Sequence, residues 1–174
     1  MSEREFDGLV KITQLPQRGM VTVRGDLGST AMKKAVGKVP DTGTCNGDVA
    51  WMSPDELLVM CPHDQVSEAT AKITKALKNT HHLVQDVSDA RVVFLINGPA
   101  SREVLAKLCP VDLSPGAFKP GRFRRTRMAQ IPCAFWMRDE LSFELVVFTS
   151  VADYAWNLLT NAADPAAPVG HFTA

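Results

Sequence analysis

Four arginines crowd the segment from Gly121 to Arg127 and are the side chains of this sequence best suited to recognising another molecule. A guanidinium is planar and always charged, and its fork of N–H donors matches a carboxylate or a phosphate. On a β-strand, Arg122 and Arg124 would share one face, and Arg125 and Arg127 the other. One interpretation is docking onto an acidic partner or a phosphate. The alternative is a solvated strand edge, where basic residues discourage aggregation.

Two tryptophans, Trp51 and Trp136, stand at equivalent positions of two predicted hairpins. They are most simply core aromatics or contacts with another subunit, because a large ring with one polar atom suits both places. Stacking on a pterin or flavin ring is the alternative. We group both tryptophans with the four arginines as a candidate partner-docking set.

Other reactive side chains form no recognised catalytic or metal-binding pattern. The four histidines include no H-E-x-x-H motif, and no two of the four cysteines have C-x-x-C spacing, so buried free thiols are expected. The acidic pairs Asp55-Glu56 and Asp139-Glu140 indicate solvated turns, since acid–base catalysis needs opposed groups in a cleft. Glycine-rich phosphate-binding motifs are also lacking. The sequence therefore predicts no catalytic residue, no cofactor and no metal in this chain.

Composition indicates an ordinary globular protein that works in a complex. The 174 residues are 45% hydrophobic and 22% charged, enough to bury a real core. Lys+Arg and Asp+Glu both number 19, so little net repulsion keeps copies dispersed, and the basic surplus of nucleic-acid binders is missing. Without a leader-like start or an apolar run of about 20 residues, we expect no membrane association and a cytoplasmic location.

Apolar runs and turn residues divide the first half into alternating strands and helices. Asp26 or Ser29 could cap a short helix, and Asp64 a longer one. Ser53-Pro54-Asp55 is typical of a hairpin turn. The expected elements are a strand over 19–24, a helix ending near Lys34, hairpin strands over 48–52 and 56–61, and a helix from Asp64 to about Lys78.

The second half opens with a buried strand over 92–96, which Asn97-Gly98-Pro99 ends. The following helix places Val104, Leu105 and Leu108 on one side and Ser101, Arg102 and Lys107 on the other, and it ends at Cys109-Pro110. Further strands are expected over 124–132, 133–137 and 141–148, then a last helix that Ser150 and Asp153 could cap, and an irregular tail over 165–174.

The two halves repeat one order of elements. Residues 50–57 echo residues 135–141, and each copy leads into an apolar strand and then a helix. Two β-α-β-β-α units of this kind share sheet surface with helices on one side. We therefore predict an α+β fold whose halves, 1–80 and 81–164, pack as one body.

Four motifs of the second half occur in a fixed order: DVSDAR from Asp86, NGPASREVLAKLCPVDL from Asn97, the Pro120-Gly121 connection, and Tyr154-Ala155-Trp156 in the closing helix. In order and spacing they resemble the gamma subunits of heterotetrameric sarcosine oxidase. The resemblance runs from about Gly19 to Ala163 and is strongest after Asp86. That family is related to the folate-binding half of glycine-cleavage aminomethyltransferases, so the resemblance also implies their fold.

The resemblance implies a bacterial complex that oxidatively demethylates sarcosine, using O2 and tetrahydrofolate, to glycine, 5,10-methylenetetrahydrofolate and H2O2. It places FAD, FMN, NAD and folate in the alpha and beta subunits and zinc in the delta subunit, and makes the gamma subunit an accessory, structural partner of these three. Two alternatives are a stand-alone folate-binding or aminomethyl-transfer protein, and a related complex acting on dimethylglycine.

This sequence departs from the motifs of the catalytic relatives. Aminomethyltransferases carry a Gly-Gly-x-x-Asp-Asp turn, whereas the corresponding stretch here, which starts at Gln130, has no carboxylate up to Met137. Iron–sulfur-maintenance relatives carry Lys-Gly-Cys-Tyr-x-Gly, whereas Pro120-Gly121-Arg122-Phe123 lacks the cysteine. Both departures argue against independent chemistry.

Overall fold

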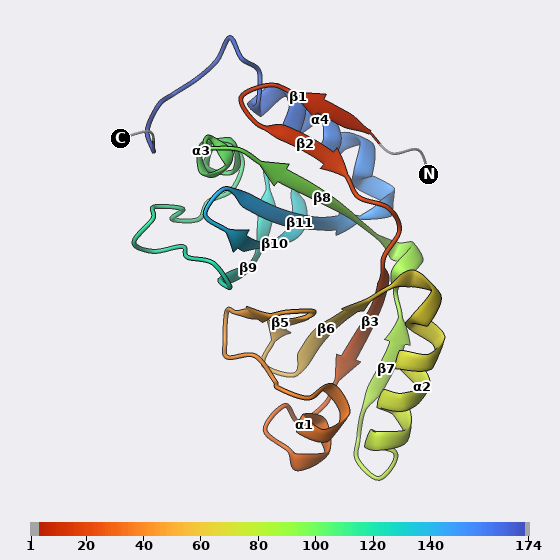
Figure 1. Cartoon of the computed structure of the whole chain (residues 1–174). Helices are drawn as coiled ribbons and strands as arrows, with labels where there is room; N and C mark the ends of the chain where they lie inside the picture. The colour runs from red at the N-terminus through yellow and green to blue at the C-terminus, as the bar shows by residue number, and fades with distance from the viewer. Residues whose placement is uncertain (1–3, 173–174) are drawn as a thin grey trace. The chain divides into compact units, whose positions relative to one another are not determined.

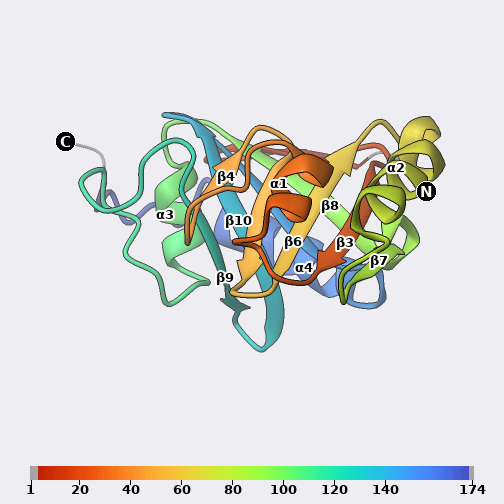
Figure 2. The ribbon, with the colours of Figure 1, turned by 90° about the horizontal axis from the view of Figure 1, so that it is seen from below.

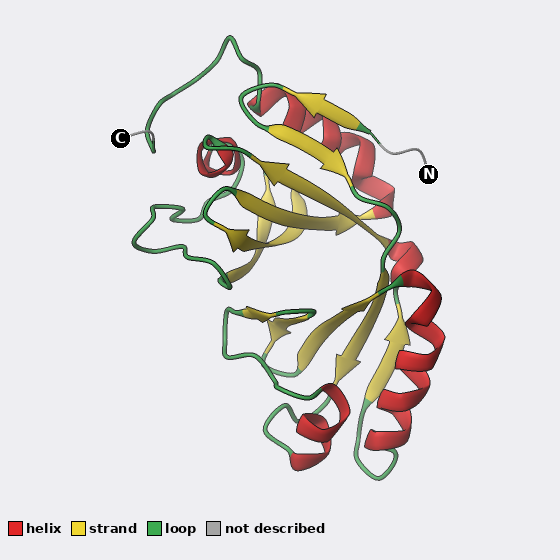
Figure 3. Ribbon diagram, in the orientation of Figure 1, coloured by secondary structure: helices red, strands yellow, loops and turns green. Residues whose placement is uncertain are grey.

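A computed structural model describes residues 4–172, and its contacts divide the chain into two compact units. The inserted unit comprises Gln17–Asp89. The main unit is built from both ends of the chain, namely the residues up to Pro16 and those from Ala90 onward. Each unit combines an antiparallel sheet with helices (Figure 3), which confirms the predicted α+β class.

The main unit contains a six-stranded sheet in the order β1-β2-β8-β11-β10-β9 (Figure 1). All of its neighbouring strands are antiparallel. Helices α3 and α4 contribute to the same hydrophobic core as the strands, and Phe94, Phe135 and Phe143 lie fully buried within it. The elements are β1 (Glu5–Asp7), β2 (Lys11–Gln14), β8 (Arg91–Asn97), α3 (Ser101–Ala106), β9 (Phe123–Met128), β10 (Ile131–Asp139), β11 (Ser142–Phe148) and α4 (Ala152–Ala162).

The inserted unit contains a five-stranded sheet in the order β4-β5-β6-β3-β7. Helix α2 lies beside β7 and β3 and also contacts α1 (Figure 2). Val21, Val23 and Leu57 from the strands meet Ile73 and Leu77 from α2 in the core of this unit. The elements are β3 (Gly19–Arg24), α1 (Thr30–Val36), β4 (Cys45–Asn46), β5 (Val49–Ser53), β6 (Glu56–Cys61), α2 (Val66–Leu77) and β7 (Leu83–Asp86).

Several predicted elements are confirmed, but two predicted helix caps are wrong. Ser29 caps α1, because its hydroxyl accepts a hydrogen bond from the Met32 amide at 3.1 Å. Neither Asp64 nor Ser150 caps a helix. A short 3₁₀ turn precedes each of these helices, at His63–Gln65 and Thr149–Val151, and the expected capping residue falls inside that turn.

The predicted strand over 124–132 is in fact two strands joined by a tight turn. Strand β9 ends at Met128, and Ala129 turns the chain with φ of 50°. Strand β10 begins at Ile131, so Pro132 belongs to the returning strand and lies opposite Arg127. This hairpin has no clear signal in the sequence, because Ala129-Gln130 lacks the glycine or asparagine that usually takes a positive φ.

The predicted halves, 1–80 and 81–164, do not coincide with the two compact units. Strand β7 follows residue 80 but pairs with β3, so the inserted unit extends to Asp89. Strand β2 pairs with β8, which places the start of the chain in the main unit. Strand pairing therefore moves both boundaries. None of the helices within residues 4–172 is long and apolar enough to cross a membrane.

Gly8 should be intolerant of any side chain, because its chain segment approaches α4 closely. A Cβ at Gly8 would lie 2.2 Å from the carbonyl oxygen of Ala163, which already accepts a hydrogen bond from the Leu9 amide at 2.8 Å. We expect Gly8→Ala to lower the free energy of unfolding by about 1–3 kcal/mol, as overpacking does. Gly116→Ala is the matched control, because an added Cβ there meets nothing within 4 Å. Equal urea midpoints for the two variants would contradict this prediction.

Candidate docking surface

Strand β9 carries the arginine segment at one end of the main unit's sheet. Phe123 and Met128 are buried at the two ends of the strand, only 2% and 0% exposed; Met128 belongs to the core of the main unit, and Phe123 packs on Trp136. Arg124, Arg125 and Arg127 are exposed between them, and the fourth arginine, Arg122, is exposed just before the strand. The strand is thus pinned by its apolar ends and presents its charges outward.

The register of β9 on β10 distributes the arginines over both faces of the sheet. Arg124 lies opposite Phe135, whose ring belongs to the core covered by α3 and α4. Arg125 and Arg127 lie opposite Ala134 and Pro132, on the other face. The guanidinium groups therefore line a strand edge and do not converge on one point.

The charge of this surface is strongly local. Between Asp112 and Asp139 the sequence has no acidic residue but contains Lys119, Arg138 and the four arginines. A chain with zero formal net charge thus concentrates positive charge along one hairpin. Such a field attracts an acidic partner and orients its approach.

The two tryptophans belong to different units. Trp136, on β10, is 4% exposed, and its ring stacks on Phe123 at 6.2 Å between centroids. Trp136 therefore supports β9 by packing on Phe123, and it is not among the exposed residues of the candidate docking set. Trp51 belongs to β5 of the inserted unit, where it is half-buried opposite Leu57.

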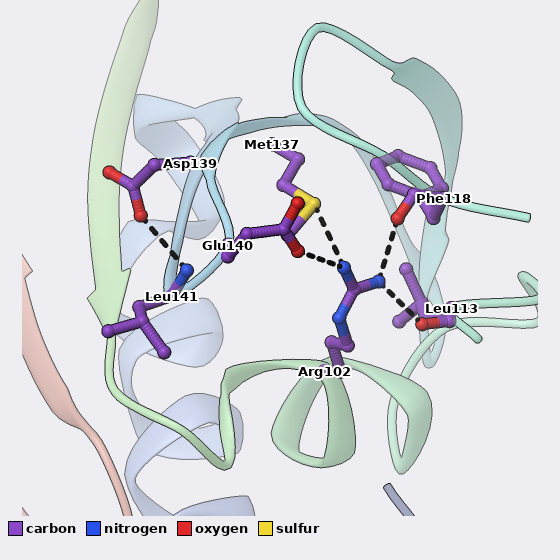
Figure 4. Close-up of polar contacts among 7 residues, drawn as sticks. All are labelled: Arg102, Leu113, Phe118, Met137, Asp139, Glu140 and Leu141. Carbon is purple, nitrogen blue, oxygen red and sulfur yellow. Dashed lines mark hydrogen bonds and ion pairs between the residues drawn. The ribbon is translucent and has the colours of Figure 1, made fainter. Parts of the chain in front are cut away.

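Arg102, at the start of α3, fixes the connection that leads into β9 (Figure 4). Its guanidinium donates to the carbonyl oxygens of Leu113 at 2.8 Å and Phe118 at 2.7 Å, and to the sulfur of Met137 at 3.3 Å. Glu140 approaches the same group at 3.3 Å from a largely exposed position. Because Arg102 is only 6% exposed, these contacts hold the 113–118 segment against the sheet.

Arg102 was predicted on the side of the helix opposite Val104 and Leu105, and that side is buried as well. Helix α3 has six residues, and Ser101, Arg102 and Glu103 are all buried along with Val104 and Leu105. Periodicity distinguishes inside from outside only where one side of a helix faces water. Here both sides of α3 are buried, and no pattern in the sequence shows that the side with Ser101 and Arg102 is covered as well.

The segment after α4 is bound by Glu103 and Lys107 of the α3 region. The Glu103 carboxylate accepts from the amides of Val169 and Gly170, both at 2.7 Å. Lys107 Nζ donates to the carbonyl oxygens of Ala162 at 2.9 Å and Ala167 at 2.8 Å. Backbone hydrogen bonds, foremost from Val169, lower the pKa of Glu103. Over 165–172 the tail is irregular, as predicted, yet it is held in place, and the last two residues of the prediction lie outside the described part of the chain.

A second polar feature lies in the inserted unit, around a cavity of about 860 Å³. Arg24 and Asp55 form an ion pair there at 2.6 Å, so their charges are already matched. His81 and His82 line the same cavity. Among residues 4–172, no group of three or more His, Cys, Asp or Glu is placed to hold a metal ion. This cavity carries no arrangement of acid, base or nucleophile that would specify a reaction.

Two of the four cysteines are buried, as expected for free thiols. Cys109 is 5% exposed and Cys133 is 4% exposed. A hydrogen bond with Cys109, together with burial, raises the pKa of the Cys133 thiol. Cys45 and Cys61 are half-buried instead. A thiol whose pKa is raised is a poor nucleophile, so Cys133 acts in packing.

Comparisons with known proteins agree on one family. Residues 21–174 match the family model described as the GCVT N-terminal domain. The chain is 31% identical over 172 residues to the sarcosine oxidase subunit gamma of Corynebacterium sp. (strain P-1), covering 93% of this chain and 84% of the relative. It is 33% identical over 168 residues to the subunit gamma of Arthrobacter sp., covering 90% of this chain and 82% of the relative.

Solved structures extend the comparison to the fold. A chain of heterotetrameric sarcosine oxidase from Corynebacterium sp. U-96, in complex with pyrrole 2-carboxylate, superposes with a TM-score of 0.82 at 29% identity, over 95% of this chain and 91% of that chain. The glycine cleavage system aminomethyltransferase T from Bartonella henselae superposes with a TM-score of 0.64 at 14% identity, over 84% of this chain and 44% of that chain. The second likeness concerns the fold alone.

Replacing Arg102 should destabilise the main unit, because two buried carbonyl oxygens would lose their donor. We expect Arg102→Met to lower the free energy of unfolding by about 2–4 kcal/mol, measured by urea denaturation. Amide exchange in the 113–118 segment should also become faster. Lys72→Met, on the exposed side of α2, is the control and should change stability by less than about 0.5 kcal/mol. An Arg102→Met protein as stable as the control would show that the guanidinium is dispensable.

The bond between Glu103 and the tail should make stability depend on acid pH. The folded-state pKa of Glu103 lies below its ordinary value, so its contribution is complete above the unfolded pKa and is lost as pH falls through the folded pKa. At neutral pH, Glu103→Gln should be less stable than the wild type by about 1–2 kcal/mol. That difference should shrink once the pH drops below about 4. A difference that is constant over this range would argue against an ionised Glu103.

Proposed function

Because this chain belongs to the GCVT N-terminal domain family, as the gamma subunit of a heterotetrameric sarcosine oxidase, we propose that it works by assembly and carries no reaction centre of its own. The observation that carries the proposal is the cationic edge strand β9, whose exposed arginines are anchored by Phe123 and Met128. A subunit that docks needs such a fixed, charged surface. Catalysis would need convergent reactive groups in a cleft instead.

The partners in this proposal are the alpha, beta and delta subunits of the oxidase. Together they would oxidatively demethylate sarcosine with O2 and tetrahydrofolate, giving glycine, 5,10-methylenetetrahydrofolate and H2O2. FAD, FMN, NAD, folate and zinc would belong to those subunits. The polar groups of this chain support that division, since Arg24 is paired with Asp55 and Arg102 binds backbone carbonyls.

An acidic protein surface fits the arginine strand better than a phosphate does. Phosphate recognition gathers several donors around one anion. Here Arg124 points to one face of the sheet and Arg125 and Arg127 to the other, so no single anion engages all three. Carboxylates spaced along an extended partner would match the strand at each position.

We also propose that the two units descend from one β-α-β-β-α plan. Reading the sheets from the same edge gives β4-β5-β6-β3 in one unit and β9-β10-β11-β8 in the other. In each unit the opening strand is followed by a short helix, the hairpin, and a longer helix. Irregular register also occurs at matching places, between Trp51 and Ser53 and between Met137 and Asp139. Corresponding order in chain and sheet supports a duplication.

Charge reversal tests the docking function. Arg124→Glu combined with Arg125→Glu should reduce recovery of the other oxidase subunits with a tagged copy of this chain by about tenfold or more, because like charges would oppose acidic groups. The double variant Lys72→Glu, Lys75→Glu on exposed positions of α2 makes the same change in net charge and is the control. Co-expression, affinity purification and mass spectrometry measure the recovery. Undiminished assembly of the arginine variant would refute docking through β9.

A further inference from the structure

The backbone of β9, and not only its arginines, is arranged to bind a partner; this inference rests on the proposed assembly function. Within residues 4–172 the strand pairs with β10 on one side only, so it ends the six-stranded sheet. An end strand presents main-chain N–H and C=O groups to any chain that can extend the ladder. Which residues present them follows from the pairing with β10.

The pairing pattern shows which main-chain groups face outward. In antiparallel pairs, residues that exchange hydrogen bonds alternate with residues that do not. The Met137 amide donates to the Arg122 carbonyl at 3.1 Å, so this pair is bonded. Alternation along the register then bonds Arg124 with Phe135 and leaves the main chain of Arg127 directed away from β10. Phe123 and Arg125 share that orientation.

Pro132 confirms this assignment independently. It lies opposite Arg127 and has no N–H to donate, so the pair belongs to the non-bonded class. The outward amides and carbonyls of β9 therefore come at every second residue, and those of Arg125 and Arg127 belong to exposed residues, whereas Phe123 is buried. That spacing is the one that a further antiparallel or parallel strand requires.

We propose that an extended acidic segment of another oxidase subunit adds to the main unit's sheet as a strand beside β9. The main chains would exchange hydrogen bonds at Arg125 and Arg127, the exposed residues whose main chain faces away from β10. Carboxylates of the added segment would pair with Arg124 on one face and with Arg125 and Arg127 on the other. An acidic, alternating sequence is therefore the recognition element, and the arginines select it from other extended chains.

A second copy of this chain is a poorer occupant. Two β9 strands side by side would oppose arginines to arginines. The opposite end of the sheet, β1, carries Glu5 and Asp7 and could meet β9 of another copy head to tail. Glu5 is already paired with Lys11 at 3.1 Å, and β1 is only three residues long. Such a contact would also repeat without closing and give filaments.

Arg127→Pro compared with Arg127→Ala separates the backbone contribution from the charge. Both variants remove the guanidinium, but only proline removes the outward N–H and obstructs an added strand. The bonds of β9 to β10 do not involve the main chain of Arg127, so the sheet stays intact. Each tagged variant is co-expressed with untagged wild type and the other oxidase subunits, and the ratio of the two gamma chains in the purified complex is measured.

We expect Arg127→Pro to be incorporated about tenfold less well than Arg127→Ala, as the loss of one hydrogen bond and a steric block imply. Equal thermal midpoints of the two isolated variants control for folding. Amides of Arg125 and Arg127 should also exchange more slowly in the complex than in the free chain. Equal incorporation of the two variants, or unchanged exchange at these amides, would overturn strand addition.

Three outcomes distinguish failure of the assembly function from failure of strand addition. Failure of the wild-type chain to recover any oxidase subunit would refute the assembly function itself, and strand addition with it. Concentration-dependent oligomers of the isolated chain that Arg127→Pro abolishes would identify a second copy as the occupant and overturn the proposal. Normal charge-dependent assembly with equal incorporation of the proline and alanine variants would leave docking intact and refute only the strand-addition mode.

Discussion

The buried guanidinium of Arg102 is the constraint on which the geometry of the main unit depends. Removing a charge from water is costly unless the protein supplies compensating partners. Its nearest carboxylate, Glu140, is 3.3 Å away, and that side chain is 72% exposed, so the ion pair compensates weakly. The carbonyl oxygens of Leu113 and Phe118 must therefore stay in place, and the connection between α3 and β9 has no freedom to move away.

The contacts of Arg102 also constrain the candidate docking surface. Phe118 packs on Phe135 and Phe143, with ring centroids 5.4 Å and 5.8 Å apart, so fixing its backbone also fixes the centre of the core. Phe135 lies on β10 directly opposite Arg124 of β9. A surface whose supports are rigid loses less conformational entropy when it binds. The order of the 113–118 segment would thus contribute to the proposed docking, although none of its own residues is charged.

The sequence alone could predict those features of the molecule that are encoded by residues close together in the chain. The strand over 19–24, the Ser29 cap and the hairpin after 48 are encoded by neighbouring residues and were confirmed. The arginine strand was also found, because its residues are contiguous. The burial of Arg102 depends on residues 11 to 38 positions away in the chain, so local pattern could not reveal it.

The predicted domain boundary differs from those of the compact units for the same reason, because strand pairing between residues far apart in the chain sets them. Residues before Pro16 read as a polar start, yet their register with β8 places them in the main unit. The resemblance to a known family supplied the function, which no local pattern did. The residues alone predicted no reaction centre and identified a charged strand, and the choice between solvation and docking stayed open at that level.

The two explanations of the arginines, protection of an edge and recognition of a partner, describe one electrostatic property. A strand at the end of a sheet is open to any extended chain, including copies of itself. Four arginines make self-pairing unfavourable because like charges would lie opposite one another, and the same charges make pairing with an acidic chain favourable. The formal net charge of zero conceals this, since it sums a cationic hairpin with acidic residues elsewhere. Selectivity for a partner follows from where the charges lie, because a partner contacts the charges of one edge of the molecule and not the net charge of the whole chain.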